Sequence, residues 1–240
     1  MAKSTNREAG FDTAAAVTRS LLGWGVVAGV FYLVVGLAQA LTRDRFDLTE
    51  HPLSLLMLGD FGWIQRTNLI LSGLMVIAAA VGFARSLRGF GAGKAAGTLV
   101  GVFGLALILS GIFAPDPMAG FPPGAEATEG SLSGLLHLAF GAIGFVCLAV
   151  AAFRLAGWLD RRSRRLASYS RVTGAVILLG FAGGAALATS PWGVLLLWIA
   201  VVTGWAWLAV ASVQLYGSVP HPDADRREAG AASAAEGRTA

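Results

Sequence analysis

A serine, a histidine and an aspartate that could act on a substrate lie close together in the middle of the chain. Ser133 and His137 are four residues apart, which places them on one face of a helix. Asp116 precedes them and stands between two prolines. A histidine can serve as a general base, and a carboxylate can orient that base or hold a metal ion. The pattern therefore makes His137, Asp116 and Ser133 candidate catalytic residues for hydrolysis or group transfer on a lipid-like substrate.

The segment that carries Asp116 is built differently from the rest of the chain. Residues 111–124 read GIFAPDPMAGFPPG, and proline and glycine restrict or redirect the backbone at many of these positions. A loop that only joins two helices does not need such a rigid construction. The composition therefore predicts a shaped loop that leads directly into the helix of His137.

The ligand-type residues do not define a metal or a cofactor. The chain has three histidines and one cysteine, and it has no His-x-x-x-His or His-Glu-x-x-His motif. A haem held by His51 and His137 is conceivable, although His51 is expected to lie outside the spans. Charged side chains are missing from the middle of the apolar runs, which argues against ion-coupled transport. The sequence therefore leaves both metal content and cofactor unspecified.

A second group of polar residues lies before and inside the second apolar run. Residues 51–59 are predicted to form a short helix at the membrane interface that carries His51 and Ser54. Gln65 and Asn68 are three residues apart, and their shared face must point into the protein to avoid lipid. The candidate ligand-binding residues are therefore His51, Ser54, Gln65, Asn68, Asp116 and His137.

The elements that position these residues are six long apolar runs. Each is near or above the roughly 20 residues that a helix needs to cross a bilayer core of about 30 Å. We predict an all-α, polytopic transmembrane bundle of six helices in residues 21–216. Residues 1–20 are expected to be an N-terminal tail, and residues 217–240 a disordered C-terminal tail. The expected spans are 21–41, 63–84, 95–113, 132–156, 171–189 and 192–216.

The basic residues indicate an orientation in the membrane. If the six runs alternate in direction, all but three of the 18 Lys and Arg residues fall on the side that holds both termini. The exceptions are Arg43, Arg45 and Arg66. The positive-inside rule then predicts cytoplasmic termini in a multi-pass protein of the inner (plasma) membrane. This distribution fits contact with membrane lipids and argues against nucleic acid as a partner.

Small residues at helical spacing predict close packing of these helices. Gly25 and Gly29 are four apart, as are two further pairs, and such pairs allow backbones to approach in lipid. Asp60 is placed to cap the second helix. Oligomeric state is not specified by these patterns. The further glycine pairs are Gly97 with Gly101 and Gly180 with Gly184.

Two segments together resemble a known family. The first, residues 51–68, reads HPLSLLMLGDFGWIQRTN. The second is the proline and glycine loop of residues 111–124, followed by Ser133 and His137. In this order they are similar to the six-helix bacterial membrane proteins catalogued as domain of unknown function 998. The resemblance covers roughly residues 20–216. It implies a polytopic membrane protein and assigns no catalytic residue.

Three functions are compatible with these observations. The first is an outward-facing polar pocket that binds a lipid headgroup or a small amphiphile, because the polar residues of the spans gather at one end. The second is a membrane-embedded hydrolase or transferase with His137 as its base. The third is a non-catalytic subunit or a transporter. The first is the principal hypothesis.

Overall fold

The computed structural model describes residues 11–91, 93–126, 130–224 and 226. These residues form six long helices and one short 3-10 helix, with no β-strand in the described ranges, so the predicted all-α fold is confirmed. All six long helices are long and apolar enough to cross a membrane. The helices are α1 (Thr13–Thr42), η1 (Leu53–Met57), α2 (Gly62–Ser86), α3 (Gly93–Ile112), α4 (Leu132–Asp160), α5 (Arg164–Ala186) and α6 (Pro191–Tyr216).

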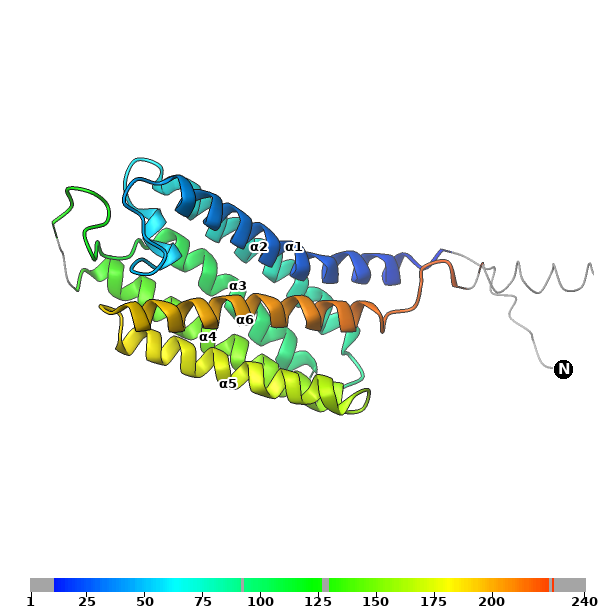
Figure 1. The fold of residues 1–240 in the computed structure, drawn as a ribbon. Helices are drawn as coiled ribbons and strands as arrows, with labels where there is room; N and C mark the ends of the chain where they lie inside the picture. The colour runs from blue at the N-terminus through cyan, green and yellow to red at the C-terminus, as the bar shows by residue number, and fades with distance from the viewer. Residues whose placement is uncertain (1–10, 92, 127–129, 225, 227–240) are drawn as a thin grey trace, which may run out of the picture.

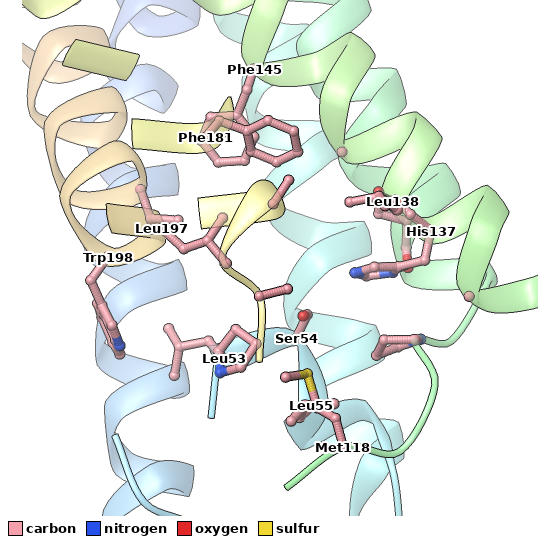
Figure 2. Close-up of a pocket in the computed structure, with 18 of the residues that line it drawn as sticks. Leu53, Ser54, Leu55, Met118, His137, Leu138, Phe145, Phe181, Leu197 and Trp198 are labelled. Carbon is pink, nitrogen blue, oxygen red and sulfur yellow. Dashed lines mark hydrogen bonds between the residues drawn. The ribbon is translucent and has the colours of Figure 1, made fainter. Parts of the chain in front are cut away.

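The six long helices form a closed ring. Each helix packs against the next one in the chain, and α6 packs back against α1 (Figure 1). We call the end with η1 and residues 113–126 the loop end. The opposite end, where α1 begins and α6 finishes, is the terminal end. At the loop end the ring surrounds a cavity, which Figure 2 shows in close-up.

Two helices begin earlier than hydrophobicity alone predicts. α1 begins at Thr13, where the side chain of Asp12 accepts a hydrogen bond from the Ala15 amide (2.9 Å). α5 begins at Arg164, where the Ser163 hydroxyl caps the Leu166 amide. Apolar runs mark only the part of a helix that lies in hydrocarbon, whereas capping residues mark where its backbone begins. The expected tail 1–20 is therefore helical from Thr13, and residues 1–10 lie outside the described ranges.

The loop between α1 and α2 contains the predicted short helix, η1, directly after Pro52. Gly59 follows with a positive φ of 72°, a conformation that favours glycine. The expectation that Asp60 caps α2 is wrong, because the N-cap is Phe61 and it makes no side-chain capping bond. Instead, the backbone turns tightly, and the Gly62 amide donates to the Gly59 carbonyl (2.9 Å). A backbone carbonyl thus accepts the bond from the first amide of α2.

Glycines allow the closest helix contacts. A Cβ atom placed on Gly73 of α2 would lie 2.5 Å from the carbonyl oxygen of Gly104 on α3, and one on Gly104 would lie 2.8 Å from the Gly73 oxygen. The predicted Gly180 and Gly184 pair similarly faces α6. Because lipid offers no hydrophobic drive for helix association, such close backbone packing contributes strongly to the fold.

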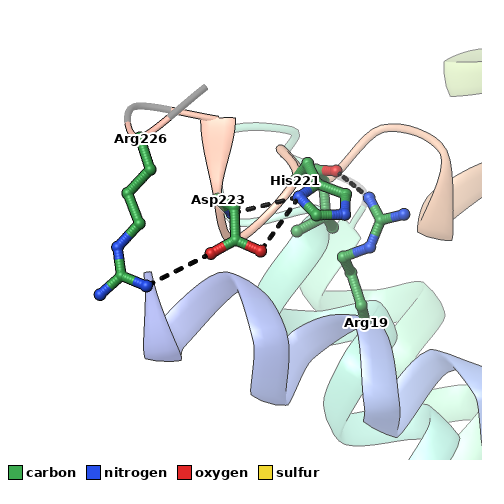
Figure 3. Close-up of polar contacts among 5 residues, drawn as sticks. Arg19, His221, Asp223 and Arg226 are labelled. Atoms are coloured by element: carbon green, nitrogen blue, oxygen red, sulfur yellow. Dashed lines mark hydrogen bonds and ion pairs between the residues drawn. The ribbon is translucent and has the colours of Figure 1, made fainter. Parts of the chain in front are cut away.

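Part of the predicted C-terminal tail packs against α1. The Arg19 guanidinium donates to the Val219 carbonyl (2.7 Å) and lies 3.9 Å from the ring centre of Tyr216. The Asp12 amide donates to the Pro222 carbonyl (2.9 Å). Figure 3 shows Arg19 of α1 near His221, and the ion pair of Asp223 and Arg226 in the same segment. The structure therefore places residues 217–223 beside α1, in the segment for which disorder was predicted, whereas residues 227–240 lie outside the described ranges.

Candidate functional site

A cavity of about 820 Å³ occupies the loop-end half of the ring. Its walls come from α3, α4 and α6, with further residues from α1, α2 and α5, and η1 and the segment 115–119 lie at its loop end. On α4 the lining runs from Gly134 to Leu148, and on α6 from Pro191 to Trp205. Each of these ranges covers fourteen helical steps, or roughly 21 Å, so both helices indicate the same depth for the cavity. This volume lies within the range of about 300–1,000 Å³ found for ligand sites.

His137 is fixed at the side of this cavity by the end of α3. Its Nδ1 lies 2.9 Å from the carbonyl oxygens of both Ser110 and Phe113. Two carbonyl acceptors require that Nδ1 carries the hydrogen, which leaves Nε2 of the neutral ring as an acceptor. Nε2 has no hydrogen-bond partner within the described ranges, and Figure 2 shows the ring pointing into the cavity. His137 therefore offers the cavity one free acceptor.

The other two catalytic candidates bond to groups other than His137. The Ser133 hydroxyl donates to the Ala114 carbonyl (2.8 Å). The Asp116 carboxylate accepts bonds from the Ser131 amide (3.1 Å) and from the Ser131 hydroxyl. These contacts place Asp116 at the N-terminus of α4, where a negative charge is favourable. The structure thus brings Asp116 and His137 to one cavity but does not join Ser133, His137 and Asp116 by hydrogen bonds.

His51 belongs to the roof of the cavity, which we define as residues 46–58 and 115–122. Its Nδ1 accepts a bond from the Asp47 amide (2.8 Å), and Nε2 then donates to the Ala119 carbonyl (3.1 Å). The ring also contacts Phe46 and Phe121, at centroid distances of 5.3 and 5.4 Å. His51 is 2% exposed and is not part of the cavity lining. Its role in this structure is to join two loops.

Two further contacts tie the roof to the helices. The Arg43 guanidinium at the end of α1 donates to the Leu58 carbonyl and lies 5.9 Å from the Phe121 ring centre. Burial lowers the pKa of Arg43, and the charge of Asp60 partly opposes this shift. On the other side, the Trp198 indole of α6 donates to the Leu48 carbonyl (3.2 Å).

Removal of the His51 side chain is expected to loosen the roof. His51→Ala leaves the Ala119 acceptor without its partner, at a cost of about 2 kcal/mol. We expect this to lower the midpoint of thermal unfolding in detergent by roughly 4–8 °C. The control is His221→Ala, because His221 is exposed in the segment that follows α6. Equal midpoints for the two variants would contradict the assigned role of His51.

Gln65 and Asn68 lie in the seam between α1 and α2, away from the cavity lining. Gln65 accepts bonds through Oε1 from the side-chain amides of Gln39 (2.9 Å) and Asn68 (3.1 Å). Asn68 also donates to the Tyr32 carbonyl (3.0 Å). Both residues are at most 1% exposed. This network joins α1 to α2 within the membrane span, although Oε1 of Gln39 and Nε2 of Gln65 are buried without a partner among the described residues. Among the predicted ligand-binding residues, only Ser54, Asp116 and His137 line the cavity.

The described ranges contain no cluster of three or more His, Cys, Asp or Glu side chains that could hold a metal ion. Our sequence analysis also did not connect α6 and the preceding loop with the site. Their lining residues are apolar or hydroxyl side chains, which look like ordinary span residues in sequence. The lining residues missed in this way include Thr189, Ser190, Trp198 and Trp205.

Comparison with known proteins agrees with this architecture. Neither the curated proteins nor the solved structures include a match to this chain. One protein family does match, and the match covers residues 26–214, which contain all six long helices in whole or large part. By that match the chain belongs to the family described as Protein of unknown function (DUF998) and is a multi-pass membrane protein.

Proposed function

We propose that the protein binds an amphiphile, or the head of a lipid, in the cavity of the loop end. The observation that supports this most strongly is the division of the cavity along its length. Near the loop end it is lined by His137, Ser54, Glu50 and Thr189, and deeper it is lined mainly by aromatic and aliphatic side chains. A ligand with a polar head and an apolar body matches this division, because apolar burial stabilises the body while a few polar groups fix the head.

The deep part of the cavity has few groups that could hold a polar ligand. Phe103, Phe145 and Leu148 contribute only hydrocarbon. Its polar groups are the hydroxyl of Tyr32 and the indole N–H of Trp205, and the centres of these two rings are 5.2 Å apart. A fully polar solute would lose its hydration here with little compensation, so a hydrocarbon body is favoured.

We further propose that the loop end faces outward and the terminal end faces the cytoplasm of a plasma membrane. The support is the excess of arginine and lysine at the terminal end. A reporter enzyme that is active only in the cytoplasm, fused after residue 240, is expected to be active. Activity only of a reporter that works outside the cytoplasm would overturn this orientation.

The binding proposal is tested by titrating the purified protein with a fluorescent single-chain amphiphile in nanodiscs of a saturated lipid. We expect saturable binding of one molecule per chain, displaced by an unlabelled amphiphile of the same chain. Non-saturable partition, equal to that into protein-free nanodiscs, would contradict the proposal.

A further inference from the structure

The position of His137 sets the length of the apolar part beneath it. Leu148, the deepest α4 residue of the lining, follows His137 by eleven residues, which corresponds to roughly 16 Å of helix. A bilayer core of about 30 Å gives each leaflet a chain depth of about 15 Å. The space below His137 thus matches one lipid chain, with the first polar atoms of the ligand at the level of the imidazole.

The charges at the cavity select against an anionic head. Glu50 and Asp116 carry the charges of the lining, and neither lysine nor arginine lines the cavity among the described residues. Among the described residues of the loop end, three arginines are outnumbered by six acids, a net charge of −3. Arg43, which contacts the roof from the end of α1, donates to the Leu58 carbonyl and is not in the lining. An anion entering this site would meet like charges and find no cation to pair with.

The hydrogen-bonding state of His137 adds a second requirement. Its Nδ1 hydrogen is committed to the Ser110 and Phe113 carbonyls, so the neutral ring presents only an acceptor to the ligand. A head group that lacks a donor would desolvate Nε2 without replacing its bond to water, which weakens binding.

We infer that the occupant is a single-chain amphiphile whose head is uncharged or cationic and donates a hydrogen bond to Nε2 of His137. This inference rests on the proposed function, because it specifies the ligand of the same cavity. A long-chain alcohol or amine has these properties, whereas a methyl ether lacks the donor and a fatty acid anion lacks both the donor and the permitted charge.

The test compares four amphiphiles that share one saturated chain: a primary alcohol, a primary amine, a methyl ether and a carboxylate. At pH 7 the amine is a cation and the carboxylate an anion. Each competes with the fluorescent amphiphile in the displacement assay. We expect the alcohol and the amine to bind roughly tenfold more tightly than the ether, and the carboxylate to bind more weakly than the alcohol.

Two variants assign these differences to residues. His137→Asn keeps a side-chain donor where Nδ1 stood and removes Nε2, so the alcohol and the ether should bind equally. Glu50→Gln should weaken the amine relative to the alcohol, while the ratio of alcohol to ether stays unchanged. Continued binding of the ether by His137→Asn shows that this variant is folded, since the chain then still enters the cavity.

The outcomes separate this inference from the function on which it rests. Failure of all four compounds to displace the probe would contradict the proposed function itself. Displacement by all four with equal affinity would support the proposed binding function but overturn the inferred selectivity for the head group. Tightest binding by the carboxylate, or an unchanged ratio of alcohol to ether in His137→Asn, would also overturn it.

Discussion

Gly141→Phe is expected to weaken the binding of a long-chain amphiphile by roughly 100-fold while the protein stays folded. Gly141 lines the cavity one helical turn below His137, and a Cβ atom there would lie 3.7 Å from the Phe181 ring, an ordinary contact. A phenyl group extended from this position occupies the space of the chain. If about four methylene groups lose their burial, binding weakens by about 3 kcal/mol, or roughly 100-fold. The displacement assay measures this directly.

The matched control for this variant is Gly157→Phe on the same helix. Gly157 is exposed near the terminal end, and its added Cβ would lie 3.8 Å from Phe90, again an ordinary contact. We expect its affinity to equal that of the wild type. Similar affinities of Gly141→Phe and the wild type, with both proteins folded, would mean that the amphiphile binds elsewhere.

Gly73→Ala is expected to destabilise the bundle strongly although it adds one methyl group. The new Cβ would lie 2.5 Å from the Gly104 carbonyl oxygen, a backbone atom that cannot move without shifting α3. Overpacking of this kind costs about 1–3 kcal/mol. We expect a lower midpoint of thermal unfolding in detergent, and weaker ligand binding, because α3 carries Ser110, one of the carbonyls that orient His137.

Gly101→Ala provides the comparison within the same α2–α3 contact. There the added Cβ would lie 3.6 Å from the Ala80 side chain, which is ordinary van der Waals distance. Alanine also favours the helix over glycine by about 1 kcal/mol. The midpoint should therefore stay unchanged or rise. A loss of stability in Gly101→Ala as large as that in Gly73→Ala would argue against the close approach at Gly73.

The fold could be predicted from sequence because lipid imposes a simple rule on composition. A span must be apolar over about 20 residues, and each of the six runs meets this condition. The helix ends were predicted less accurately. α1 and α5 begin in polar sequence, where Asp12 and Ser163 cap their first turns. The placement of residues 217–223 beside α1 includes the Arg19 to Val219 bond, a contact across 200 positions that no local pattern reveals.

The site was predicted in part, for reasons that lie in the polar residues themselves. His137 and Asp116 were found because a polar group in an apolar chain needs a partner or a role. The same reasoning selected Gln65 and Asn68, which instead bond to each other between α1 and α2. Sequence alone does not distinguish a polar side chain that is bonded to its neighbours from one that is left free. The free acceptor of His137 emerges only from the two carbonyls at its other nitrogen.

The most direct test of an amphiphile in this cavity is to map where its chain end lies. A long-chain alcohol with a photoreactive diazirine at the chain end is bound, irradiated and located by peptide mass spectrometry. We predict labels on Phe103, Leu148 and Trp205, and their loss when unlabelled alcohol is added. Labels confined to outward-facing residues such as Val172 and Leu179, which are 61% and 73% exposed, and unaffected by competitor, would contradict the account.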